Sequence, residues 1–163
     1  MPLTFDVSRT DVRDRFLRVV VREAVTTLEA DIRPAWGRMT PQQMVEHLTW
    51  MFDVSVGAAQ VPCFVGEEQQ KQIRIFLYDE HPSPRNLRNP ALAAGLPPLR
   101  SPDFAAAIAA MDLARRRYVD LDESSRRVAF AHPVFGPLVH EEWSRFHYKH
   151  VFHHLLQFGL IDV

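Results

Sequence analysis

The C-terminal part of the chain contains one long segment, from about His140 to Phe158, with the pattern of an amphipathic helix. Pro137 precedes the segment and Gly159 follows it, and both residue types commonly stand near helix ends. At about 100° per residue, one side of this helix collects aromatic and polar side chains together. They are Trp143, Phe146, His147, His150, His154 and Gln157. The charged residues fall on the opposite side: Glu141, Arg145 and Lys149. We therefore expect the helix to bury its histidine-bearing face.

Two of these histidines have the spacing of a metal-binding pair. His150 and His154 are four residues apart, so a helix places both imidazoles on one face, one turn apart, within reach of a single ion. A third histidine from a neighbouring helix would complete the set and leave coordination positions open. In the alternative interpretation, the pair hydrogen-bonds to the backbone or lies along a solvated cleft.

A second helix is predicted to begin after Thr40. Pro41 suits the first helical turn, and Gln43 has the spacing of a capping box with Thr40. One apolar stripe of this helix contains His47, and its members are Met44, His47, Met51 and Val54. The residues predicted to point away from the stripe are Glu46, Thr49 and Asp53.

The remaining pattern is also mainly helical. We expect a first helix from Thr10 or Asp11 that ends before Pro34, and a third main helix capped by Ser101 with Pro102 at its first position. Residues 67–78 are predicted to form a short helix, and residues 128–135 a short extended segment. Residues 79–100 contain five prolines and are predicted to form a long loop, a length that is usual for functional or loosely ordered segments. The fold class is therefore predicted to be all-α.

Composition limits the setting and the partners. The chain has 163 residues, the size of one domain, so we expect a single helical domain over residues 1–163. Its formal net charge of -1 gives no general attraction to nucleic acid or to anionic membranes. The single cysteine, Cys63, excludes an internal disulfide, and no signal-peptide core or membrane-length apolar run is present. We expect a cytoplasmic protein that acts on a small molecule.

Two sequence blocks resemble a known family. GRMTPQQMVEHL (37–48) and HPVFGPLVHEEWSRFHYKHVFHHLLQFG (132–159) are similar to the DinB/YfiT-like metalloprotein superfamily and, more narrowly, to a bacterial subgroup of it with no assigned function. The resemblance implies a four-helix bundle, here with a long Pro-rich loop. It also implies a metal held by three histidines, which in this sequence are His47, His150 and His154. Leu155 stands where the wider superfamily often has arginine in HHRxQ, so a role of that arginine does not carry over.

Other residues near this set have candidate roles. His147 lies one turn before His150 and is a candidate fourth ligand or proton shuttle; it could also simply line the cleft. Gln157 lies one turn beyond His154 and is a candidate for orienting a bound water or a histidine ring, or for a hydrogen bond at the helix end. His153 is expected to face a neighbouring helix or solvent.

The function predicted from the resemblance is metal-dependent thiol chemistry. Characterised relatives include S-transferases and an isomerase that use a low-molecular-weight thiol such as bacillithiol or mycothiol, so the resemblance implies transfer of such a thiol to an electrophile. Zinc and nickel are the favoured divalent ions, while iron, copper and manganese also suit imidazole. The loop arginines Arg85, Arg88 and Arg100 could meet carboxylates of an acidic thiol, or could be solvated. Because relatives are often dimers, a homodimer is one assembly the chain could form.

Two other functions fit the same sequence. A metal-dependent hydrolase would need a general base, and both Glu46 and Asp53 are predicted to point outward. A non-enzymatic protein could use the metal for structure or for binding a small molecule in a stress response. Loss of the fold on metal removal would separate a structural metal from a catalytic one.

Overall fold

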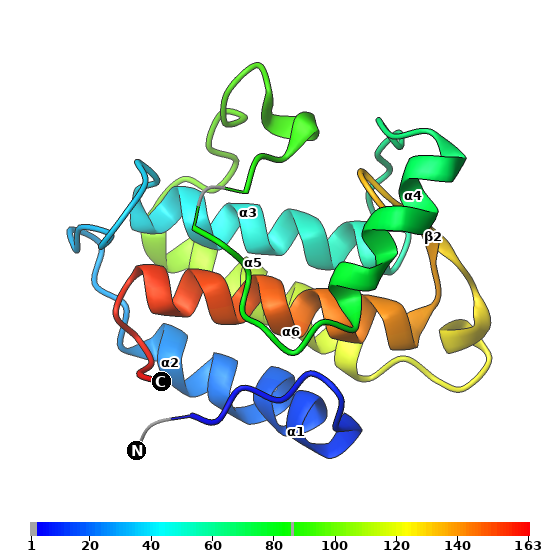
Figure 1. Cartoon of the computed structure of the whole chain (residues 1–163). Coiled ribbons are helices and arrows are strands. Elements are labelled where there is room, and N and C mark those ends of the chain that lie inside the picture. The colour runs from blue at the N-terminus through cyan, green and yellow to red at the C-terminus, as the bar shows by residue number, and fades with distance from the viewer. Residues whose placement is uncertain (1–2, 86) are drawn as a thin grey trace.

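Four helical stretches lie side by side and form the body of the molecule (Figure 1). The computed structural model describes residues 3–85 and 87–163. The first stretch is continuous and is made of α1 (Thr10–Arg15), the π-helical segment η1 (Phe16–Val20) and α2 (Val21–Thr26). The other three are α3 (Pro41–Ser55), α5 (Phe104–Val119) and α6 (His140–Gln157). The predicted all-α fold, a four-helix bundle with a long Pro-rich loop, is confirmed.

Large apolar side chains from all four stretches fill the interior of the bundle. The core includes Leu17, Val21, Leu48, Phe52, Met111, Tyr118, Val151, Phe152 and Leu155, each less than 3% exposed. Their spacing of three, four or seven residues follows the helical periodicity of the sequence. Among the described residues, no helix combines the length and apolar character that crossing a membrane requires.

Shorter elements cover the ends of the bundle. They are α4 (Glu67–Ile73), η2 (Arg74–Leu77), η3 (Pro90–Leu92), η4 (Ser125–Arg127), β1 (Phe130–His132) and β2 (Gly136–Leu138). The two strands pair antiparallel, with Phe130 opposite Leu138. The extended segment predicted at 128–135 therefore contains the first strand of a hairpin, and β2, which was not predicted, is its second strand.

The start of α3 agrees with the prediction, and the start of α5 does not. Thr40 and Gln43 form the expected capping box, since the Thr40 side chain accepts from the Gln43 N–H and the Gln43 side chain accepts from the Thr40 N–H. The predicted Ser101 cap is wrong, because Asp103 caps α5 by accepting from the Ala106 N–H. The Ser101 N–H instead donates to Glu46, which fastens this part of the chain to α3.

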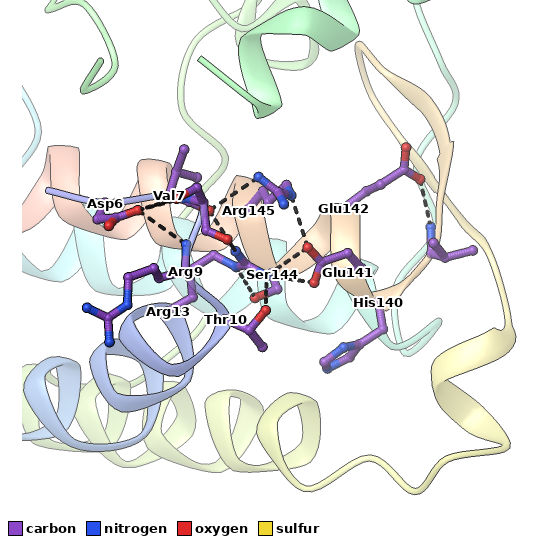
Figure 2. Close-up of polar contacts among 12 residues, drawn as sticks. Asp6, Val7, Arg9, Thr10, Arg13, His140, Glu141, Glu142, Ser144 and Arg145 are labelled. Carbon is purple, nitrogen blue, oxygen red and sulfur yellow. Dashed lines mark hydrogen bonds and ion pairs between the residues drawn. The ribbon is translucent and has the colours of Figure 1, made fainter. Parts of the chain in front are cut away.

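Cationic side chains are buried inside the molecule. Lys149 was expected on the exposed side of α6 but is only 1% exposed, and its Nζ donates to the carbonyls of Phe76 and Asp79. Arg13 is fully buried between α1 and α6, where it contacts the Glu141 carboxylate (Figure 2). Both cations hold irregular backbone segments against the bundle.

One buried histidine of the hairpin should make stability depend on pH. Burial lowers the pKa of His132 to about 3, while its Nδ1 accepts from the N–H groups of Val134 and Phe135. Below the ordinary histidine pKa of about 6.5, His132 binds a proton in the unfolded chain but stays neutral in the folded protein. The free energy of unfolding therefore falls as pH falls from about 6.5 towards 3. His132→Asn keeps an acceptor at the turn and cannot titrate. We expect it to reduce the slope of unfolding free energy against pH by up to about 1.4 kcal/mol per pH unit in that window.

Urea unfolding at pH 7, 6, 5 and 4 measures this slope. The smaller Asn side chain costs packing at every pH, so only the difference in slope is diagnostic. Equal slopes for the two proteins would mean that His132 takes up its proton in the folded state.

Candidate metal centre

Three histidine nitrogens converge where α3 and α6 lie against each other. His47 comes from the middle of α3, and His150 and His154 come from successive turns of α6. His47 Nε2 lies 2.9 Å from His150 Nε2, and His154 Nε2 lies 3.2 Å from the same atom. All three ligand atoms lie within 4.8 Å of one another. The structure thus brings together the three histidines singled out in the sequence.

Two of the nitrogen distances, and the protonation of the three rings, fit a metal ion. Nitrogens on one tetrahedral or octahedral ion stand about 2.9–3.4 Å apart at metal–nitrogen distances of about 2.0–2.1 Å, and the distances from His150 Nε2 to the other two Nε2 atoms, 2.9 and 3.2 Å, fall in this range. Burial lowers the pKa of His47 to about 4, and it lowers the pKa of His150 and of His154 well below the ordinary value. The imidazoles are therefore neutral near pH 7, as ligands must be.

Without a cation the central ring would be poorly satisfied. His150 Nε2 faces two other Nε2 atoms, and one proton can make only one well-aligned hydrogen bond. The other ring nitrogen of His150, Nδ1, is buried and has no hydrogen-bond partner within residues 3–85 and 87–163. A cation at the meeting point of the three Nε2 atoms would accept all three lone pairs at once.

Gln157 sets the orientation of the His154 ring. The carbonyl of Trp36 can only accept, so the Gln157 amide must turn its Nε2 towards that oxygen, at 2.8 Å. Gln157 Oε1 then faces His154 Nδ1, also at 2.8 Å, so Nδ1 carries the proton. His154 Nε2 is left with its lone pair directed at the other two histidines. Of the roles considered for Gln157, the contacts match the orienting of a histidine ring.

Gly37 allows this contact to form. Its φ is +78°, which favours glycine, and a Cβ at this position would lie 2.8 Å from Gln157 Nε2. The Ala35 N–H also donates to the Gln157 carbonyl. The segment before α3 thus fixes the end of α6, which explains why the sequence block around His47 begins at a glycine.

Replacing Gln157 with leucine should weaken metal binding without unfolding the bundle. The variant removes the acceptor that fixes the His154 tautomer, so we expect metal affinity to fall about 10–100-fold. Competition with a coloured chelator measures the affinity, and circular dichroism checks the fold. Gln157→Glu is the informative companion, because a carboxylate keeps the acceptor for Nδ1 and should retain more affinity than leucine. Equal affinity in the wild type and the leucine variant would contradict the orienting role.

His147 lies one turn from the three histidines but makes separate contacts. It is fully buried, its ring stacks on Phe52 at 4.3 Å, and its Nε2 lies 2.8 Å from Ser55 Oγ. Because Ser55 donates its own proton to the Phe52 carbonyl, His147 Nε2 is the donor in this contact. His147 therefore joins α6 to α3 inside the core and lies outside the group of potential ligands in the described chain. These contacts favour neither a ligand nor a proton shuttle.

A cavity of about 320 Å³ opens beside His47. One wall is α3, which contributes Gln43, Glu46, His47 and Trp50. The other wall is the Pro-rich loop, which contributes Ala91, Leu92, Gly95, Leu96, Pro97, Leu99 and Arg100. Figure 1 shows this part of the chain rising over α3. The sequence predicted this loop but left its role open. In the structure it covers the side of α3 from which His47 is reached.

Glu46 holds the loop in place. It was predicted to point outward, but its carboxylate accepts from the backbone N–H groups of Arg100, at 2.7 Å, and Ser101, at 3.0 Å. Burial opposes the charge, yet these hydrogen bonds keep the pKa of Glu46 below its ordinary value. The side chain does point away from the core, as predicted, but it meets the loop instead of solvent, because periodicity describes only which side of α3 faces the core. Nothing in the local sequence signals this contact.

The beginning of the loop is fastened on the α6 side. The Arg85 guanidinium lies 4.3 Å from the centre of the Trp36 ring, a cation–π contact. His153 Nδ1 lies 3.3 Å from the Ser83 carbonyl, so this histidine faces the loop and takes no part in the three-histidine group. Arg88 is exposed. The three loop arginines therefore lie in three different environments.

Comparison with known proteins agrees with the geometry. No curated protein and no solved structure matched the chain. The family model of the DinB superfamily matches residues 10–158, which includes all four helical stretches and the three histidines. The chain belongs to the DinB superfamily.

Proposed function

We propose that the chain is a metal-dependent enzyme that activates a low-molecular-weight thiol for transfer to an electrophile. The observation that carries the proposal is the convergence of three neutral imidazole nitrogens beside a cavity of about 320 Å³. His47, His150 and His154 would hold a divalent ion, with zinc and nickel favoured by the all-imidazole ligand set. Superfamily membership supports a metal, and the thiol is the class of substrate implied by the resemblance of the sequence blocks.

The chemistry needs an acidified thiol in a sheltered place. A bound divalent ion lowers the pKa of a thiol, so that the reactive thiolate forms near neutral pH. The chain supplies the rest: burial keeps the three histidines neutral, Gln157 fixes the His154 tautomer, and the loop limits the access of water. Three protein ligands would leave coordination positions open for a substrate, and of the three histidines His47 lines the cavity.

A hydrolase is less well supported. Glu46 is the carboxylate that lines the cavity, and a hydrolase would use such a group as a general base. Both oxygens of Glu46 already accept hydrogen bonds, from Arg100, Ser101 and the Gln42 side chain. A base so occupied, with its pKa held low, is poorly suited to remove a proton from water.

The first test is the metal content of tag-free protein, measured by mass spectrometry. We expect close to one equivalent of a single divalent metal. Protein loaded with cobalt is then titrated with cysteine, glutathione and other small thiols while its absorption spectrum is recorded, and a thiolate ligand should add an intense sulfur-to-metal band. If no small thiol changes the spectrum, the thiol-transfer proposal fails even when the metal is present.

Chelation separates an enzyme from a protein with a structural metal. The apolar core is built from all four helical stretches, and most of it lies away from the histidines, so we expect the metal-free protein to keep its helical circular dichroism. Collapse of the fold on chelation would favour the non-enzymatic alternative.

A further inference from the structure

The cavity beside His47 has walls of unequal character. The α3 wall carries polar groups that are already engaged, since Gln43 Oε1 accepts from the Thr40 N–H and Glu46 accepts from the loop backbone. The loop wall is built mainly from hydrocarbon side chains. They are Ala91, Leu92, Leu96, Pro97 and Leu99, and Trp50 of α3 adds an aromatic surface. An apolar ligand would cover these hydrocarbon side chains and remove them from water.

One lining residue adds a positive charge to the cavity. Arg100 lines the cavity, and its charge favours the ionised forms of Glu46 and Asp53 nearby without a direct ion pair to either among the described residues. Its backbone N–H is held by Glu46, so the residue has a fixed position while its guanidinium stays available. A guanidinium recognises carboxylate or phosphate through paired N–H donors. The oxygens of Glu46 are hydrogen-bonded by the backbone and by Gln42, so the N–H donors of the guanidinium are left for a ligand even though its charge also acts on Glu46.

We propose that this cavity binds a molecule with an apolar body and one anionic group, with the body against Trp50, Leu92 and Leu96 and the anion at Arg100. The volume, about 320 Å³, is at the lower end of the roughly 300–1,000 Å³ usual for small-molecule sites, which favours a compact ligand. The inference rests on the proposed function only in assigning this molecule as the electrophilic partner of the thiol. The binding preference itself can be tested on metal-free protein.

Straight-chain acids provide a direct probe. Butyrate, hexanoate and octanoate are titrated into metal-free protein by isothermal titration calorimetry, beside the neutral octanamide. We expect affinity to rise about fourfold for each added methylene group that enters the apolar wall. Octanoate should bind about fivefold more tightly than octanamide, the range of a partly exposed ion pair.

Three variants test where the probe binds. Arg100→Gln should remove the advantage of octanoate over octanamide, while Arg88→Gln, on the same loop but outside the cavity lining, should leave it unchanged. Leu96→Ser should weaken both probes about tenfold, because it removes hydrocarbon surface from the wall. Arg88 and Arg100 are exposed, so neither substitution should disturb folding.

Several results would overturn the inference. Equal binding of acid and amide, or the same loss in the Arg88 and Arg100 variants, would exclude an anion site at Arg100. Affinity that does not depend on chain length, or that Leu96→Ser leaves unchanged, would exclude the apolar wall. If the expected binding pattern appears but the protein holds no metal, the proposed function fails while the binding preference stands.

Discussion

Replacing Arg13 with methionine is expected to lower the free energy of unfolding by about 3 kcal/mol, the upper part of the range for hydrogen bonds made by a charged group. Arg13 is fully buried and donates to the backbone carbonyls of Val7 and Ser8 as well as to the Glu141 carboxylate, at 2.6 Å (Figure 2). Methionine fills a similar length but has no donor, so the Ser8 carbonyl loses this partner, and the Val7 carbonyl and Glu141 are left with Arg145. Urea denaturation followed by circular dichroism measures the change.

Two further variants serve as controls for Arg13→Met. Arg9→Met removes an arginine whose side chain is 62% exposed and paired with Asp11, so it should change stability by less than about 0.5 kcal/mol. Glu141→Gln keeps an acceptor for Arg13 on a side chain that is 49% exposed, so its effect should lie between the two. If Arg13→Met is as mild as Arg9→Met, the buried arginine does not stabilise the N-terminal segment against α6.

Replacing His154 with alanine should abolish metal binding near neutral pH. Changes that only reorient a ligand lower metal affinity about 10–100-fold. This variant removes one of three ligands, so we expect a larger loss of affinity. The measurement is metal content by mass spectrometry together with chelator competition. Protein stability should change less than metal affinity, because Gln157 and Trp36 still join α6 to the segment before α3.

His153→Ala is the matched control for this variant. His153 is adjacent in sequence and also a histidine on α6, but it contacts the Ser83 carbonyl and Trp36 instead of the other ligands. It should retain near-stoichiometric metal. Retention of near-stoichiometric metal in both variants would mean that His154 is not a ligand.

Local patterns were enough for the helices and for the histidines. The 3.6-residue period predicts α6 and its buried face, and the Thr40 capping box predicts the start of α3. The period also places His47, His150 and His154 on inward faces, although pattern alone does not bring the two helices together. The resemblance to the superfamily supplied that step, and the structure brings the three nitrogens within 4.8 Å.

Long-range contacts between polar groups were not predictable in this way. Three cationic side chains are buried because backbone carbonyls of irregular or distant segments accept their hydrogen bonds; they are Arg13, Lys149 and Arg115. The spacing of residues in the sequence does not show where those carbonyls lie. The misplaced cap at Ser101 and the missed loop contact of Glu46 have one cause, since the two residues are hydrogen-bond partners across the turn before α5. A sequence reading treats each of them alone.

The attachments of the Pro-rich loop make the two halves of the site interdependent. Glu46 holds the end of the loop and is followed directly by His47, while Arg85 rests on Trp36, whose carbonyl holds Gln157 and thereby His154. We therefore expect a molecule bound beneath the loop and an ion bound by the histidines to alter each other's affinity. Thermodynamic reciprocity then requires that the factor be the same in both directions, so that a ligand which tightens ion binding is itself held more tightly by the ion-loaded protein.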